Sequence, residues 1–295
     1  MLRKSGKGLP RMESTRFQEV FQQLTRHTQW KQTGRLRLPF QIYHPQGMVY
    51  SGGLFYLSSV ELSEAPVPTG EAGHGYDRTA GKGTGHLYVM DEQGQLLHDI
   101  QLGEGAMYHP GGIDTDGRHI WIPVAEYRPH SQSIIYKLDM ETLVVEEAFR
   151  FPNHIGGLIC NRHNGTLIGQ SWGSRRFFTW TPTGDLLQEA PNSSHFIDYQ
   201  DGQYVGGGCM LLSGIAELPA SISRSVTKYE LGGLAFVDMQ TFQLIHEVPV
   251  AEFSPQGHVI TRNPVYVKLT DQVLRLYAVP DDDFGDLLVY EVRIS

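Results

Sequence analysis

The chain has 295 residues, of which 40% are hydrophobic and 19% are charged, and its formal net charge at pH 7 is −8. The negative charge argues against binding to nucleic acid, which depends on Lys and Arg contacts to phosphates. No stretch approaches the roughly 18 apolar residues that a membrane-spanning helix requires, and the basic start lacks the apolar segment of a secretory signal. We therefore expect a cytoplasmic protein that binds neither nucleic acid nor a membrane.

The first 28 residues predict a tail followed by a short amphipathic helix. Apolar residues recur there at helical spacing, namely Phe17, Val20, Phe21 and Leu24. A Ser or Thr in the segment 14–27 is available as N-cap. Residues 29–40 then alternate like a strand and lead directly into His44.

From this point one pattern recurs along the chain: a histidine, then a turn, then an apolar strand. The four clear copies are "YHPQGMVYSGG" from Tyr43, "YHPGGIDTDGR" from Tyr108, "NHIGGLICNRH" from Asn153 and "SHFIDYQDGQY" from Ser194. A weaker fifth copy begins at Gly257. A third strand follows in every copy and a fourth in most, and four-stranded repeats of this length are typical of β-propellers.

The fifth copy lacks a fourth strand, because the chain ends after the strand at 287–292. Residues 29–40 are the natural replacement, and their pairing would close the ring and remove exposed sheet edges. We therefore predict an all-β protein: a five-bladed β-propeller over 29–295, closed by an N-terminal strand and preceded by the tail and helix of 1–28. Two inserts, 65–85 and roughly 215–230, lengthen the spacing between copies, and the first is expected to form a lid or rim over the axis.

The repeated histidines are the main candidates for a functional site. The first strand of each propeller blade lines the central axis, so these side chains should converge at its mouth. Adjacent glycines would let the backbones approach closely and leave room for a ligand. One hypothesis is that neutral imidazoles bind a divalent metal ion, such as Zn, Fe, Mn or Ca; the alternative is that each histidine only hydrogen-bonds the backbone of the next blade. The predicted ligands are His44, His109, His154, His195 and, as a possible fifth, His258.

Acidic and basic residues follow the histidines on the same face. Glu126 and Asp198 are candidates for a general base. Arg128 or Arg175 would bind an anionic group of the substrate, and Tyr127 is a further candidate contact. The alternative is a set of inter-blade salt bridges, with Arg128 simply pairing with Glu126.

Several segments carry a resemblance to known proteins. The stretches "YHPQGMV", "LGEGAMYHPGGID", "VAEYRPHSQSIIYKLD", "SWGSRRF" and "RNPVYV" resemble an uncharacterised family, a domain of unknown function, of bacterial and fungal five-bladed propeller proteins. This resemblance covers most of the chain from about Tyr43 onward and implies the fold. A more distant similarity, carried by "PQGMVYSGGLFYLSS" and "LGEG", links the chain to plant-type glutaminyl cyclases, which are also five-bladed.

These observations lead to three hypotheses on function. The first is a metal-dependent hydrolase or lyase that acts on a small molecule in the axial pocket, where the metal would polarise the substrate or activate water. The second is a non-catalytic propeller that binds a ligand or protein, and the third is acyl transfer like that of the glutaminyl cyclases. Substrate, metal identity, oligomeric state and the pairing of Cys160 with Cys209 stay open at this point.

Overall fold

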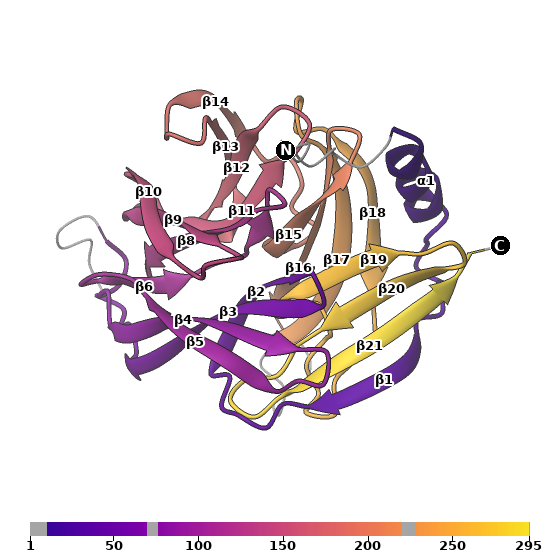
Figure 1. The fold of residues 1–295 in the computed structure, drawn as a ribbon, viewed down its shortest axis with the longest axis horizontal. Helices are drawn as coiled ribbons and strands as arrows, with labels where there is room; N and C mark the ends of the chain where they lie inside the picture. The colour runs from indigo at the N-terminus through magenta and orange to yellow at the C-terminus, as the bar shows by residue number, and fades with distance from the viewer. Residues whose placement is uncertain (1–10, 70–75, 220–227, 295) are drawn as a thin grey trace, which may run out of the picture.

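The computed structural model describes residues 11–69, 76–219 and 228–294. Its strands form five antiparallel sheets arranged as the blades of a β-propeller (Figure 1). Each blade has four strands in order from the axis outward, with one additional short strand in the second blade. The predicted all-β, five-bladed architecture is confirmed.

The blades follow one another along the chain. Blade one consists of β2 (His44–Ser51), β3 (Leu54–Glu64), β4 (Lys82–Asp91) and β5 (Leu96–Leu102). Blade two consists of β6 (Met107–Pro110), β7 (Asp114–Thr115), β8 (His119–Glu126), β9 (Ser133–Asp139) and β10 (Val145–Phe151). Blade three consists of β11 (Ile155–Asn161), β12 (Thr166–Ser171), the 3-10 turn η2 (Trp172–Ser174), β13 (Arg176–Trp180) and β14 (Leu186–Pro191). Blade four consists of β15 (Asp198–Gly206), β16 (Cys209–Pro219), β17 (Lys228–Asp238) and β18 (Leu244–Val250).

Blade five joins the two ends of the chain. It consists of β19 (Val265–Leu269), β20 (Val273–Ala278), β21 (Asp286–Arg293) and, as its outer strand, β1 (Lys31–Arg37). β1 runs antiparallel to β21, and the two lie side by side in Figure 1. The N-terminal strand therefore completes the last blade as predicted, and β21 is not left as an open edge.

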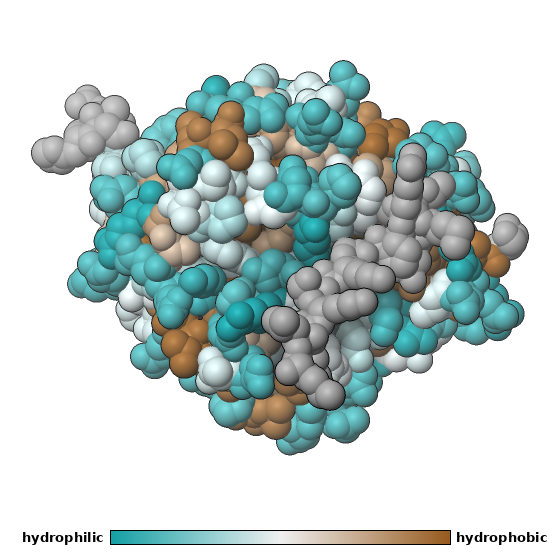
Figure 2. All heavy atoms as spheres, turned by 45° about the horizontal axis from the view of Figure 1, so that its top comes forward, coloured by the Kyte–Doolittle hydropathy of each residue, from teal (hydrophilic) through white to brown (hydrophobic). Residues whose placement is uncertain are grey.

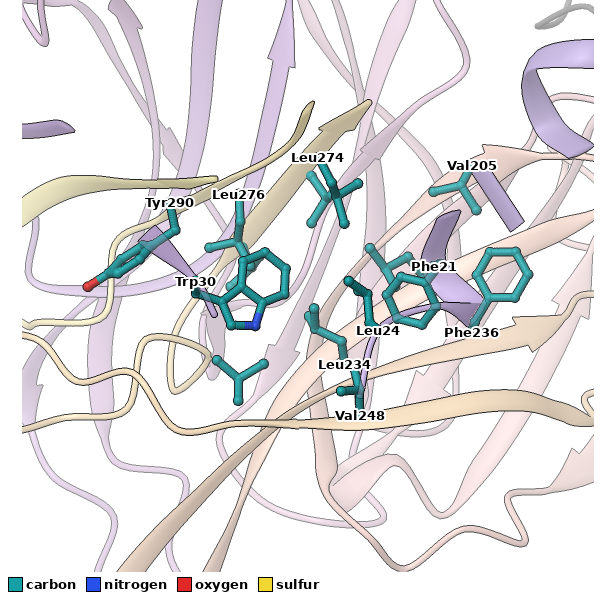
Figure 3. Close-up of a cluster of buried hydrophobic side chains, with 14 of the residues drawn as sticks. Phe21, Leu24, Trp30, Val205, Leu234, Phe236, Val248, Leu274, Leu276 and Tyr290 are labelled. Atoms are coloured by element: carbon teal, nitrogen blue, oxygen red, sulfur yellow. The ribbon is translucent and has the colours of Figure 1, made fainter. Parts of the chain in front are cut away.

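The helix α1 (Arg11–Gln22) packs on blade four, where it contacts the inner strand β15; Figure 1 shows the helix at this side of the propeller. It begins before Ser14 and Thr15, so neither can be the N-cap that the sequence suggested. Residues 11–13 are Arg, Met and Glu, which have high helix propensity and extend the helix past both residues. The rings of Phe17 and Phe21 stack on Phe236, with centroids 6.1 and 5.5 Å apart (Figure 3). The predicted packing of an amphipathic helix on the propeller is confirmed.

Hydrophobic side chains fill the space between neighbouring blades. Five buried clusters account for the five interfaces, and the one between blades four and five also takes in α1 and Trp30 (Figure 3). Each fully buried large side chain stabilises the fold by about 1.5–3 kcal/mol. The face drawn in Figure 2 is mostly hydrophilic, with small separate hydrophobic areas. Cys160 and Cys209 are both buried and free.

The described parts of the second expected insert are sheet. Residues 215–219 continue β16 and residues 228–230 belong to β17, with Pro219 opposite Lys228. These two strands are longer than their counterparts in blades two, three and five. The remaining part, 220–227, lies outside the described residues, as do residues 70–75 of the first insert. Within residues 11–69, 76–219 and 228–294, no helix has the length and apolarity to cross a bilayer.

Two buried carboxylates tie the inner strands together. Asp201 of blade four accepts backbone hydrogen bonds from Met48 of blade one at 2.9 Å and from Ile113 of blade two at 3.2 Å. Asp114 of blade two accepts one backbone N–H each from blades three and four, at 3.1 and 2.9 Å. Backbone groups that lack a strand partner at the axis are thereby satisfied, and the positions of the blades relative to one another are held.

Candidate functional site

Close approach of the inner strands explains most of the glycines beside the histidines. A Cβ atom on Gly47 would lie 2.5 Å from the backbone nitrogen of Ile113, and one on Gly111 would lie 2.3 Å from the carbonyl oxygen of Gly156. These glycines therefore serve strand packing and do not leave space for a ligand. Gly156 differs, because a Cβ there would make only ordinary contacts, with Nε2 of His154 at 3.4 Å and the carbonyl oxygen of Gln170 at 3.9 Å, and Gly156 lines a cavity.

This cavity, of about 300 Å³, opens where the inner strands of blades one to four begin; we call it the axial cavity. It is lined by His44, Gln46, His109, Tyr127, His154, Gly156, Ser171, Trp172, Gly173, Asp198, Tyr199, Gln200 and Glu217. The lining thus combines three imidazoles, two carboxylates, amides, hydroxyls and the three large aromatic residues Tyr127, Trp172 and Tyr199. It includes no Arg or Lys among the described residues. Such a surface suits a small polar molecule that is neutral or cationic.

His154 is held in one orientation by the neighbouring blade. Its Nδ1 lies 2.9 Å from the backbone carbonyl oxygen of Glu126, so Nδ1 carries the proton and donates. Burial lowers the pKa of His154 to about 4. At neutral pH the ring is therefore uncharged, and its Nε2 is a free acceptor beside Gly156 at the cavity wall.

His44 has a carboxylate behind it. Its Nδ1 lies 2.8 Å from Oδ1 of Asp282, a residue of the β20–β21 loop that blade closure brings next to blade one. Arg262 donates to both carboxylate oxygens of Asp282, at 3.0 and 2.8 Å, and Asn263 donates to Oδ1 at 3.0 Å. Burial alone would raise the pKa of Asp282, but the hydrogen bonds from His44 and Arg262 hold it well below its ordinary value. The ionised carboxylate orients the ring of His44 and leaves Nε2 as the nitrogen available for chemistry.

His109 is the exceptional member of the group. It is 5% exposed, and neither ring nitrogen has a hydrogen-bond partner. Its ring stacks on Tyr127 with centroids 4.1 Å apart, and it lies 6.3 Å from the ring of His154. Burial lowers the pKa of His109 well below its ordinary value, and the imidazoles of His154 and His44 lower it further. A buried polar side chain without partners is rare and costs stability.

The other two predicted histidines do not line the axial cavity. His195 is exposed, and its Nδ1 accepts a hydrogen bond from Arg175 at 2.7 Å. His258 lies 2.8 Å from Glu230 through Nδ1 and is half-buried. The ring of five histidines expected from the repeat is therefore a set of three around the cavity.

Of the predicted catalytic and substrate-binding residues, likewise, some line the axial cavity and others do not. Tyr127 and Asp198 line the cavity. Glu126 is buried and forms an ion pair with Arg128, with Nε to Oε2 at 2.6 Å, so neither points a free charge at a ligand. Arg175 pairs with Asp198 at 3.1 Å. Arg128 and Arg175 therefore form salt bridges, as the alternative interpretation proposed. Glu126 contributes to the site through its backbone carbonyl oxygen, which accepts the hydrogen bond from His154.

The first insert contributes to the rim, as expected. The guanidinium of Arg78 lies over the ring of Trp172, 4.9 Å from its centroid. The ring of Tyr76, also in this insert, has its centroid 3.6 Å from the guanidinium of Arg128. These cation–π contacts attach the end of the insert to residues beside the axial cavity.

Asp282, Arg262 and Asn263 were missed as site residues. Asp282 lies in the run "PDDDFGD", whereas Arg262 and Asn263 open the stretch "RNPVYV", which carries only the family resemblance. Asp282 is 238 positions from His44 in sequence, and only closure of the ring brings the two together. The signal in the sequence is that "RNP" (262–264) is followed in the same blade by the acidic run at 281–283, whose carboxylates can accept hydrogen bonds from Arg262 and Asn263.

The metal hypothesis receives no direct support from the arrangement of side chains. Within the part of the chain that the structure describes, no group of three or more His, Cys, Asp or Glu residues is placed to hold a metal ion. The three imidazoles of the cavity have free nitrogens, but their rings do not converge on one point as they stand.

Comparison with protein families gives one match, over residues 15–294. The chain belongs to the family of unknown function DUF6454. This agrees with the resemblance to a family of unknown function; the similarity to plant-type glutaminyl cyclases stays a prediction. None of the curated proteins compared with this DUF6454 member matches it.

Solved structures share the fold at low sequence identity. The tail fiber of Staphylococcus aureus phage P68 is 10% identical with a TM-score of 0.51, covering 94% of this chain and 55% of that one. Hydrazine synthase of Kuenenia stuttgartiensis is 10% identical with a TM-score of 0.42, covering 81% of this chain and 56% of that one. A DUF4623 family protein from Bacteroides eggerthii is 11% identical with a TM-score of 0.46, covering 91% and 77%. The DUF6454 chain thus spans little more than half the length of the first two, and the likeness concerns the fold alone.

Proposed function

We propose that the axial cavity binds a small neutral or cationic polar molecule and acts on it by general acid–base catalysis, as a hydrolase or lyase. The observation that carries this proposal is the contact between His44 and Asp282 at 2.8 Å, at the edge of a cavity that the imidazoles of His109 and His154 also line. An imidazole with a carboxylate on Nδ1 is oriented to take or give a proton at Nε2. His44 is accordingly the proposed catalytic base, and Asp282 its positioning residue.

The remaining lining fits the binding of the substrate. His154 offers an acceptor at Nε2, because its Nδ1 donates to a carbonyl oxygen. His109 offers one donor and one acceptor with no competing protein group. Tyr127 and Trp172 supply flat apolar surface, and Asp198 supplies a carboxylate. A molecule with several hydroxyl or amino groups would find partners for them here, whereas an anionic substrate would find only negative charge in the lining.

The experiment is a screen of the full chain, purified without a His-tag, for cleavage or elimination of ester, lactone, amide and glycoside substrates. For any substrate that is turned over, His44→Gln should lower kcat by roughly 10²–10⁴-fold, the usual contribution of a general base. Asp282→Asn should lower kcat by roughly 10–100-fold, because the carboxylate no longer orients the ring of His44.

His119 provides the matched control, because its Nδ1 makes a similar contact, 3.0 Å from Asp116, outside the axial cavity. His119→Gln should leave kcat unchanged. Turnover that is insensitive to His44→Gln, or equally sensitive to His119→Gln, would contradict the proposed catalytic site. Binding without any turnover would leave the alternative of a ligand-binding propeller.

A metal-assisted reaction is the second candidate, and the observation that favours it is the set of three imidazoles with free nitrogens around one cavity. His44, His109 and His154 would be the ligands after modest rotation of their rings, and a bound divalent ion would polarise the substrate or activate water. Metal content measured on untagged protein tests this candidate. Stoichiometric metal that is lost in His109→Phe but retained in His119→Gln would support it, and metal-free protein indifferent to added Zn, Fe, Mn or Ca would contradict it.

A further inference from the structure

A second cavity, of about 370 Å³, lies at the other end of the inner strands. Strand β15 connects the two, because Asp198 and Gln200 line the axial cavity while Gln203 and Val205 line the second one. At about 3.3 Å per residue, the first and last of these are roughly 20 Å apart along the strand. The second cavity is thus a separate site, bounded by blades three to five and by α1.

The charge of this second cavity is opposite to that of the first. Its lining includes three cationic side chains, Arg16, Arg162 and Lys268, and one carboxylate, Asp271. Arg16 pairs with Asp271 at 2.9 Å. Lys268 and Arg162 have no carboxylate within ion-pair distance among the described residues, although the chain as a whole carries a net charge of −8.

Arg162 has the strongest unmet bonding capacity of the three. Its Nε is buried and has no hydrogen-bond partner. Its Nη2 reaches only the carbonyl oxygen of Tyr204 at a long 3.4 Å, and the guanidinium lies 5.3 Å from the centroid of the Tyr204 ring. A guanidinium has five N–H donors in a planar fork that matches a carboxylate or phosphate group, and here most of those donors are unused.

Apart from Gln203 and Thr270, the rest of the lining is apolar or aromatic. Phe17, Val205 and Val267 and the rings of Tyr204 and Tyr266 face the cavity together with the cations. We propose that this second cavity binds a small organic anion, with its carboxylate or phosphate group on Arg162 and Lys268 and its apolar part on the aromatic rings. This site is independent of the proposed chemistry at the axial cavity.

Calorimetric titration of the full chain at constant ionic strength tests the proposal, with benzoate, phenyl phosphate and inorganic phosphate as probes. Benzoate or phenyl phosphate should bind saturably, and inorganic phosphate more weakly because it lacks the apolar part. Arg162→Gln should weaken the binding about tenfold or more, as expected for the loss of a charge-assisted hydrogen bond. Lys268→Gln, at an exposed position that the fold tolerates, should weaken it by a smaller factor.

Two control variants are used. Arg118→Gln changes an exposed arginine of blade two, which pairs with Asp139 of the same blade and does not line the second cavity. His44→Gln changes a residue of the axial cavity. Neither should change the affinity for the probes. Absence of saturable binding of both aromatic anions would overturn the proposal, as would affinities equal to those of the wild type in both Arg162→Gln and Lys268→Gln. Equal affinity for inorganic phosphate and phenyl phosphate would contradict the part of the proposal that assigns the aromatic rings.

Discussion

Asp201 and His109 are both buried polar residues on inner strands of the propeller, and they differ in how their hydrogen bonds are satisfied. Asp201 accepts backbone hydrogen bonds from blades one and two as well as from its own strand. His109 has two ring nitrogens and no partner for either. A satisfied buried carboxylate connects the blades, whereas a buried imidazole without protein partners costs stability unless a ligand or water supplies them. We propose that this difference separates a structural residue, Asp201, from a ligand-binding one, His109, at the same depth in the fold.

The largest expected effect on stability is at Asp201, the structural residue of this comparison. Asp201→Ala should lower the free energy of unfolding by about 3–5 kcal/mol, because it leaves several buried backbone N–H groups unpaired at costs of about 1–3 kcal/mol each. Urea denaturation followed by circular dichroism measures the change. Asp185→Ala, at an exposed hairpin turn, is the control and should cost less than about 1 kcal/mol. Equal losses of unfolding free energy in Asp201→Ala and Asp185→Ala would contradict the structural role of Asp201.

The second effect concerns His154 and pH. Its pKa falls from an ordinary 6.5 to about 4 on folding, so the unfolded chain binds the proton more tightly. His154 therefore contributes stability above pH 6.5 that is lost as the pH falls toward 4, up to about 3 kcal/mol at 1.36 kcal/mol per unit. Burial raises the pKa of Asp114 to about 6, which opposes this trend over nearly the same range because the stability it contributes is lost as the pH rises from about 4 to 6.

The comparison of the wild type with His154→Gln isolates the histidine, since Asp114 is present in both proteins. The difference in unfolding free energy between the two should shrink by up to about 3 kcal/mol between pH 7 and pH 4.5. A difference that stays constant over this range would show that His154 titrates normally in the folded protein.

The smallest effect on stability, and the sharpest contrast with Asp201, is expected at His109. His109→Phe replaces an unsatisfied ring by an apolar ring of similar shape that can keep its stacking on Tyr127. We expect the free energy of unfolding to stay within about 1 kcal/mol of the wild type, or to rise. Thermal denaturation measures this change, and a loss of more than about 2 kcal/mol would mean that His109 is a structural residue like Asp201.

The sequence predicts the fold better than the site, for a physical reason. Alternating strands and their four-fold grouping are local features, and the missing last strand predicted the role of β1. The positions of the histidines relative to their strands are less regular. His44 is the first residue of β2 and His154 immediately precedes β11, whereas His195 stands three residues before β15 and lies in the preceding loop.

Contacts that follow no periodic pattern account for the remaining differences. The partnership of His44 with Asp282 depends on ring closure, and the pairing of Glu126 with Arg128 depends on a turn at the end of β8. No periodic pattern in the sequence encodes either contact. Residue types alone therefore pointed to five histidines, of which three line the cavity, and left open whether the arginines are free or paired.

The central claim is that the axial cavity, with the unsatisfied His109 in its wall, is the ligand site of the propeller. The most direct measurement is a crystallographic density map of untagged protein grown with a substrate or ligand found in the screen, with anomalous data to identify any metal. The account predicts a non-protein group in the cavity, bonded to His109 and to Nε2 of His44 or His154. A map in which both nitrogens of His109 bond to protein groups, with the ligand bound elsewhere, would contradict it.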